Sequence, residues 1–223
     1  MKRKLTFDEI DQIKSLDQMK LNRNKAPTVQ VVGVNDVDFT VTVDGKDCRQ
    51  YQLWNNLLKR CYAVKFHEKH PTYIDCSVSF EWVYFSNFLV WCNNQKEFNM
   101  KDVKGNSFAL DKDITNKGNK IYSSKDCNFV PQAVNNLLTK RDGARGELPI
   151  GVCFDRKRQK FKSQITIEGK QNLIGYFATT EAAFEAYKTA KEAECKRIAN
   201  IYKDLISPIV YTALMTYTVS IDD

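Results

Sequence analysis

Residues 151–199 read GVCFDRKRQKFKSQITIEGKQNLIGYFATTEAAFEAYKTAKEAECKRIA, and this stretch decides the fold of the C-terminal part of the chain. Apolar and polar residues alternate in three short runs, the period-two pattern of strands with one buried face. Residues 156–159 and 168–170 supply the two turns. A helix is expected from about Thr180, with a sheet-facing stripe of Ala183, Phe184, Tyr187 and Ala190. We therefore predict a three-stranded antiparallel sheet packed on one helix.

The alternation assigns each residue of the second strand to one of two faces. Successive side chains of a strand point to opposite sides of the sheet. Val152 and Phe154 of the first strand and Ile174 of the third are expected to face the helix. The same inward face should hold Phe161, Ser163, Ile165 and Ile167, and the outward face Lys160, Lys162, Gln164 and Thr166.

Positive charge is concentrated around this predicted sheet. The chain carries a formal net charge of +7. Residues 139–170 contain nine lysine or arginine residues against four acidic ones. Such a cluster suits neutralisation of phosphates with release of counterions. A solvated loop is the alternative, but the interleaved Phe154, Phe161 and Ile165 require a packed face.

This C-terminal unit resembles the plant ethylene-response-factor (Apetala-type) DNA-binding domain and its phage and mobile-element relatives. The resemblance covers about a quarter of the chain. It is carried by Gly151-Val152, by the alternating Phe161, Ser163 and Ile165, by residues 174–177 (IGYF) and by residues 181–187 (EAAFEAY). In that family the sheet enters the major groove of double-stranded DNA. The implied DNA-binding residues are Arg156, Lys157, Arg158, Lys160, Lys162, Gln164, Thr166 and Lys170.

Three positions depart from the plant pattern. Cys153 and Asp155 stand where the plant domain has arginines, and the outward tryptophan of the plant domain falls near Leu173. Neither a thiol nor a carboxylate reads guanine as arginine does. The base specificity of the plant domain therefore does not transfer to this chain.

A second motif lies upstream, in residues 108–138 (FALDKDITNKGNKIYSSKDCNFVPQAVNNLL). A strand, a polar loop, a second strand and a helix opened by Pro131 are expected there. The segment resembles the ββα core of HNH (His-Me finger) nucleases. The resemblance implies that Asp111 and Asn135 would hold a divalent metal such as Mg²⁺ and that Asn119 would orient the general base.

The position of that general base is occupied by Lys112. Ammonium groups of lysine lose their proton only near pH ~10.4, so at neutral pH they do not accept a proton from water. Asp113 is the alternative base. Two outcomes stay open: hydrolysis at a divergent site formed by Asp111, Lys112, Asp113 and Asn119, or a structural turn in a relative that does not cut.

The rest of the chain predicts an ordinary globular protein. The hydrophobic share of 43% and charged share of 27% are typical of such proteins. No apolar run reaches the roughly 20 residues of a membrane span, and the N-terminus lacks a secretory pattern. Seven cysteines without a CxxC pair favour buried free thiols, although Cys61, Cys76, Cys92 and Cys127 converging on a metal is an alternative.

Four segments and a linker follow from these patterns. Residues 1–50 should form a helix, with a capping box at Thr6 and Glu9, and a hairpin around residues 35–38. Residues 51–140 should form an aromatic-rich HNH-like domain whose aromatic side chains are core rather than a base-stacking platform. Residues 139–148 read as a linker, residues 148–205 as the DNA-binding domain and residues 206–223 as a C-terminal extension.

Together these features predict an α+β protein of the reducing cytoplasm, by resemblance a phage protein in its bacterial host. Its expected partner is double-stranded DNA, docked on a basic β-sheet. The alternatives are an active metal-dependent DNA endonuclease of the homing type, a non-enzymatic regulator or host-takeover factor, and a module whose basic face meets an acidic protein.

Overall fold

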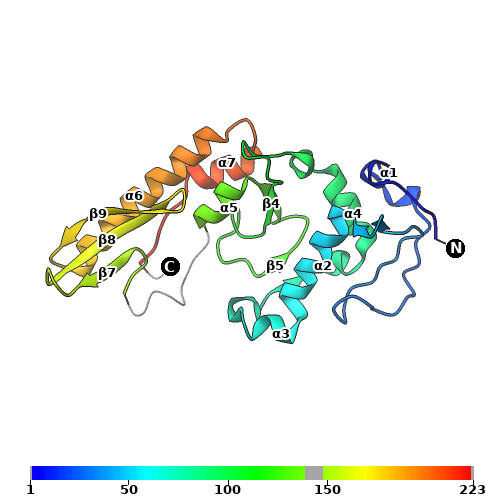
Figure 1. The fold of residues 1–223 in the computed structure, drawn as a ribbon, viewed down its shortest axis with the longest axis horizontal. Helices are drawn as coiled ribbons and strands as arrows, with labels where there is room; N and C mark the ends of the chain where they lie inside the picture. The colour runs from blue at the N-terminus through cyan, green and yellow to red at the C-terminus, as the bar shows by residue number, and fades with distance from the viewer. Residues whose placement is uncertain (1, 139–147, 222–223) are drawn as a thin grey trace. The chain divides into compact units, whose positions relative to one another are not determined.

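The computed structural model describes residues 2–138 and 148–221, and the α+β class is confirmed (Figure 1). The chain divides into two compact units. The first comprises Met1–Met100 and Leu110–Phe129, and the second Lys101–Ala109 and Val130–Asp223. Most of the expected linker, residues 139–147, lies outside the described residues. Within the described part of the chain, no helix has the length and apolar character needed to cross a bilayer.

The first unit is built on two helices that pack against each other, α2 (Arg49–Tyr62) and α4 (Phe85–Asn94). Trp54 of α2 and Phe85 of α4 are fully buried, with ring centroids 5.4 Å apart. The indole Nε1 of Trp54 donates a hydrogen bond to the main-chain oxygen of Trp82 at 2.7 Å. These aromatic side chains form the core of the unit, as predicted, because their spacing places them on the inner helix faces.

The first helix is shorter than its apolar pattern predicted. The capping box of Thr6 and Glu9 is present, but α1 (Phe7–Asp11) ends after five residues. A 3-10 helix at Leu16–Gln18 follows. Ile13 and Met19 are nevertheless buried, because the broken chain still turns them toward the same core.

The predicted hairpin around residues 35–38 is wrong. The Asp36 carboxylate is fully buried and accepts hydrogen bonds from the main-chain N–H and the hydroxyl of Ser86, at 2.9 and 2.7 Å. It therefore caps the first turn of α4 from a distant part of the chain. The hairpin that does form pairs β1 (Thr42–Val43) with β2 (Lys46–Asp47), across a turn at Asp44 and Gly45.

Short helices and strands make up much of residues 64–138. Helix α3 (Val64–His67) follows α2, and β3 (Ser77–Val78) pairs in parallel with β5 (Ile121–Tyr122). Strands β4 (Ala109–Asp111) and β6 (Asn128–Val130) form another two-stranded sheet, and the boundary between the units passes through both. Helix α5 (Gln132–Leu138) begins directly after Pro131, as predicted.

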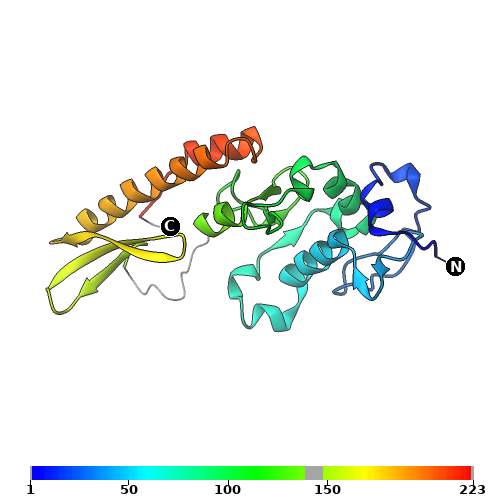
Figure 2. The ribbon, with the colours of Figure 1, turned by 45° about the horizontal axis from the view of Figure 1, so that its top comes forward.

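The second unit contains the predicted sheet and helix. Strands β7 (Val152–Asp155), β8 (Lys160–Ile167) and β9 (Lys170–Phe177) form an antiparallel sheet in that order. It lies along one side of α6 (Thr180–Ile201), drawn in orange above the sheet in Figure 2. The Thr179 side chain caps α6 by accepting the N–H of Ala182 at 3.2 Å. The sheet-on-helix prediction is confirmed.

The core of this unit lies between sheet and helix. Val152 and Ile165 of the sheet pack with Ala183, Phe184 and Tyr187 of α6. Phe154, which is also expected inward, meets Phe161 edge to face, with ring centroids 5.2 Å apart, but stays 43% exposed, at the end of β7.

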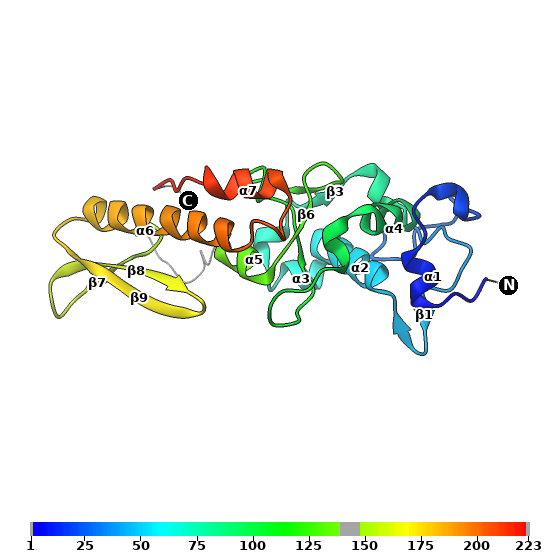
Figure 3. The ribbon, with the colours of Figure 1, turned by 90° about the horizontal axis from the view of Figure 1, so that it is seen from above.

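The C-terminal segment belongs to the same core. Helix α7 (Pro208–Met215) packs against α6 (Figure 3). Beyond it, Val219 is buried in the sheet–helix core, and its main-chain N–H donates to Glu192 Oε1 at 3.0 Å. Residues 206–221 therefore complete the hydrophobic core of the C-terminal unit.

Candidate nucleic-acid interface and the upstream loop

The strand register places the predicted outward residues on one face. β8 pairs Lys160 with Asp155 and Lys162 with Cys153 on its β7 side. On its β9 side it pairs Lys162 with Tyr176, Gln164 with Leu173 and Thr166 with Gln171. Directly opposed residues of an antiparallel pair share a face. We call this set the outward face: Cys153, Asp155, Lys160, Lys162, Gln164, Thr166, Gln171, Leu173 and Tyr176.

Lys170 is not part of this group. Its cross-strand partner is Ile167, which belongs to the opposite, helix-facing side together with Ile165. A bulge between the pairs of Ser163 and Gln164 leaves Ile174 unpaired, and this residue packs into the core. Lys170 is therefore separated from the outward lysines, although it is exposed at the end of β9.

The β7–β8 turn carries Arg156, Lys157 and Arg158, and Asp155 fixes its shape. Asp155 Oδ1 accepts the main-chain N–H groups of both Lys157 and Arg158 at 3.0 Å. These bonds, the one from Arg158 first, hold the pKa of the Asp155 carboxyl below its ordinary value. Asp155 stands where the plant domain has an arginine that contacts bases. In this chain its carboxylate instead fixes the backbone of a basic turn.

The Arg158 side chain lies across the sheet. Its guanidinium carbon is 4.5 Å from the ring centroid of Tyr176 on β9, and Nη1 is 3.3 Å from Asp155 Oδ2. Arginine stacks on aromatic faces in this way by cation–π attraction. Tyr176 is a residue that sequence reasoning missed. The available signal is its alternation with Phe177, which packs against the sheet–helix core.

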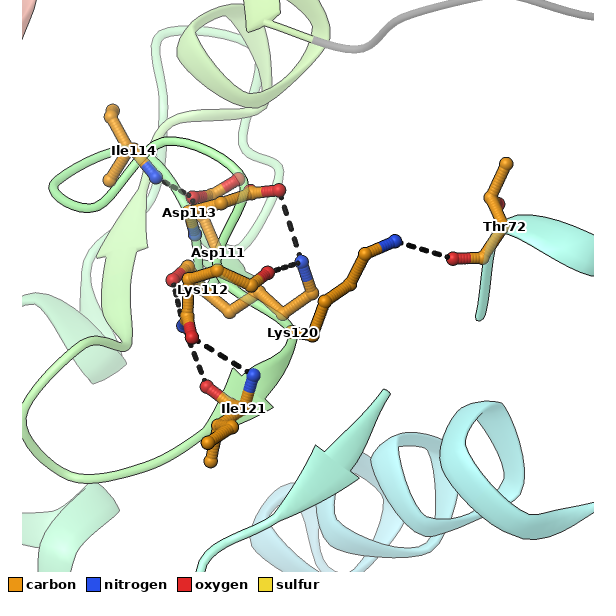
Figure 4. Close-up of polar contacts among 8 residues, drawn as sticks. Thr72, Asp111, Lys112, Asp113, Ile114, Lys120 and Ile121 are labelled. Atoms are coloured by element: carbon orange, nitrogen blue, oxygen red, sulfur yellow. Dashed lines mark hydrogen bonds and ion pairs between the residues drawn. The ribbon is translucent and has the colours of Figure 1, made fainter. Parts of the chain in front are cut away.

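In the upstream loop, the Lys112 ammonium is enclosed by neighbouring oxygens (Figure 4). Nζ lies 3.0 Å from Asp113 Oδ2 and 2.6 Å from the main-chain oxygen of Asn119, and the side chain is 11% exposed. Its position above the Tyr122 ring, 5.8 Å from the centroid, adds a cation–π contact. The ammonium is thus engaged by acceptors of the loop itself, so the geometry opposes a role for Lys112 as a base.

Asn119 joins the two ends of the same loop. Its Nδ2 donates to the main-chain oxygens of Lys112 and Ile121, at 2.8 and 2.7 Å, and its Oδ1 accepts the Ile121 N–H at 3.0 Å. The side chain therefore fixes the backbone at the position where the nuclease resemblance places the general base. The role that the resemblance implies for Asn119, orienting a general base, stays a prediction.

Asp111 supports the loop from the end of β4. Oδ1 accepts the N–H groups of Asp113 and Ile114, at 3.0 and 2.8 Å (Figure 4). Burial raises the pKa of the Asp111 carboxyl, and the Asp113 carboxylate raises it further.

The resemblance implies a Mg²⁺ site formed by Asp111 and Asn135. Asp111 belongs to the first unit, and Asn135 to α5 of the second. Among the residues whose placement is described, no group of three or more His, Cys, Asp or Glu side chains could hold a metal ion. Asn135 is an amide and falls outside these residue types, so the site expected from Asp111 and Asn135 stays a prediction.

The cysteines are free thiols, six of them buried. Burial raises the pKa of Cys48 to about 11 and that of Cys61 to about 12. Thiols with such pKa values are protonated at neutral pH and unreactive as nucleophiles. Cys153 is the partly exposed member, on the outward face.

Comparison of the chain with known protein families, with curated proteins and with solved structures finds no match.

Proposed function

We propose that this protein binds double-stranded DNA through the outward face of β7–β9 and the adjoining turn at residues 156–159. The observation that carries the proposal is the register of β8. It aligns Lys160 and Lys162 on one side of the sheet, while Ser163 and Ile165 are buried on the other.

The charge of this surface matches a phosphate backbone. Arg156, Lys157 and Arg158 of the turn adjoin the two lysines of β8, and Asp155 is the acidic residue of the outward face. Each cation that neutralises a phosphate releases condensed counterions, which drives association at moderate salt. Gln164, Thr166 and Gln171 add neutral hydrogen-bonding groups, the type that contacts base edges.

The dimensions are also suitable. The major groove of B-DNA, about 12 Å wide, admits a two-stranded β-ribbon or an α-helix. β8 and β9 pair over most of their eight residues each. Because the opposite face of the sheet is packed on α6, the helix supports the sheet without competing for the groove.

The test is a binding measurement on a fluorescein-labelled 30-base-pair duplex of mixed sequence, followed by anisotropy at several salt concentrations. The double variant Lys160→Gln/Lys162→Gln should bind at least tenfold more weakly. Its plot of log K against log salt should be shallower by about 1.8, since each phosphate contact contributes about 0.9.

The matched control is Lys196→Gln/Lys203→Gln. It removes the same charge from exposed positions on and just beyond α6, so its affinity should stay within about twofold of the wild type. Equal losses in both double variants would mean that net charge, rather than the outward face, governs binding. Competition by polyglutamate as effective as that by duplex would instead favour the acidic-protein alternative.

For the upstream loop, we propose a structural role in a protein that does not cut DNA. The contact of Asn119 with the main chain of Lys112 favours the nuclease-like scaffold, so the endonuclease alternative deserves a direct test. The enclosed Lys112 ammonium and the main-chain bonds of Asp111 are the observations against hydrolysis.

Supercoiled plasmid should remain intact with the protein in Mg²⁺ or Mn²⁺ while a gel shift shows binding. Asp111→Asn is the companion variant, because its amide oxygen retains the acceptor for Asp113 and Ile114. Metal-dependent nicking by the wild type that disappears in Asp111→Asn would overturn the structural role and establish the nuclease.

A further inference from the structure

Arg158 is held more firmly than an exposed cation at a turn usually is. Its main-chain N–H is bonded to Asp155 Oδ1 at 3.0 Å, and its side-chain Nη1 lies 3.3 Å from Asp155 Oδ2. The same guanidinium is stacked on the Tyr176 ring at 4.5 Å. Asp155 thus holds the main chain of Arg158 and one edge of its guanidinium, and Tyr176 covers one face of the guanidinium.

The stacking also determines where the guanidinium lies. Arg158 leaves the turn before β8 and crosses the start of that strand to reach Tyr176 on β9. Tyr176 is opposite Lys162, in the row that also contains Cys153. The charge is therefore placed over the outward face itself rather than at the tip of the turn.

A guanidinium placed in this way differs chemically from the neighbouring lysines. Arginine has five N–H donors in a planar fork, and the bond to Asp155 leaves donors for a ligand. That fork matches the O6 and N7 acceptors of guanine in the major groove. Lysine is a flexible point charge suited to phosphates. Prior fixation of a side chain also lowers the entropy lost on binding.

We propose that Arg158 reads a guanine in the major groove, oriented by Asp155 and Tyr176, while the lysines of the outward face and turn contact phosphates. This inference rests on the proposed DNA-binding function. It assigns sequence discrimination to Arg158. This position differs from Cys153 and Asp155, where the plant domain has its arginines.

The experiment begins with selection of preferred duplexes from a randomised pool by the wild-type protein. Each guanine of the selected site is then replaced in turn by 7-deazaguanine, which lacks the N7 acceptor and keeps the Watson–Crick pair. We expect one guanine whose replacement weakens wild-type binding about tenfold, the size of one bidentate contact.

The variants identify the residue that reads this guanine. Arg158→Met keeps an unbranched side chain but has no N–H donor, so it should bind the selected site about tenfold more weakly and lose its sensitivity to 7-deazaguanine there. Tyr176→Leu should reduce the sensitivity by removing the stack. Arg156→Met, in the same turn, is the matched control: it removes the same charge and should keep the wild-type sensitivity.

Two results would overturn the inference. A wild-type protein that binds duplexes without base preference, or an Arg158→Met variant with undiminished sensitivity at every guanine, would remove the reading role and leave the DNA-binding proposal intact. Failure of the wild type to bind any duplex at low salt would reject this inference and the DNA-binding proposal together.

Discussion

The ring of Tyr187 on α6 lies against the α-carbon of Gly151, so closely that a methyl group at Gly151 would overlap the ring. Gly151 also has φ of +79°, a conformation that residues with a β-carbon rarely adopt. Two independent constraints therefore require glycine directly before β7. The contact joins the start of the sheet to the helix that supports it.

The first prediction concerns Gly151→Ala. We expect the free energy of unfolding to fall by about 3 kcal/mol, from backbone strain and overpacking together. Urea denaturation followed by circular dichroism measures this. Gly169→Ala is the control, because Gly169 has φ of +80° and open space around it. The control should lose only about 1 kcal/mol; equal losses would mean that the Tyr187 contact is unimportant.

The second prediction concerns the buried carboxylate of Asp36. Asp36→Ala leaves the Ser86 N–H and hydroxyl without their acceptor at the start of α4, so we expect a loss of about 3 kcal/mol in stability. Asp38→Ala breaks the partly exposed ion pair with Arg3 at 2.8 Å and should cost about 1 kcal/mol or less. A smaller loss for Asp36→Ala than for Asp38→Ala would contradict the capping role.

The third prediction concerns pH. The folded state depresses the pKa of Asp155, so its contribution to stability is complete above the unfolded pKa of about 3.9 and is lost as pH falls through the lower folded value. Asp155→Asn should therefore flatten the decline in melting temperature below about pH 4. A carboxyl carbon of Asp155 that titrates at or above its ordinary pKa in NMR would refute the organised turn.

The fourth prediction concerns the upstream loop. Asn119→Asp is nearly isosteric but cannot donate to the carbonyls of Lys112 and Ile121, so we expect a loss of about 2 kcal/mol in stability. Asn116→Ala, at an exposed position of the same loop, should change stability by less than about 0.5 kcal/mol. Thermal unfolding distinguishes the two, and an unaffected Asn119→Asp would mean that the loop does not depend on this side chain.

The sequence predicted the C-terminal unit well because its signals are local. Alternation along β8 and helical spacing along α6 each determine a face, and their apolar sides must meet. The register could not be derived in the same way. The bulge at Ile174 and the pairing of Lys170 with Ile167 depend on how three strands fit over the helix.

The N-terminal errors have a different cause. Residues 29–43 alternate like a hairpin, but Asp36 has a stronger partner in Ser86, fifty residues away. A tertiary contact of this kind overrides a local turn signal and leaves no trace in the nearby sequence. The Arg158–Tyr176 contact is similar, because it joins a turn to a strand that is not its neighbour along the chain.

The most direct test of the outward face is a lysine-acylation footprint of the full chain, with and without a saturating 30-base-pair duplex, quantified by mass spectrometry. We predict that the duplex slows modification of Lys157, Lys160 and Lys162 by about fivefold or more, while Lys196 and Lys203 react at their free rates. Protection of Lys196 and Lys203 with unchanged rates at Lys160 and Lys162 would contradict the proposed interface.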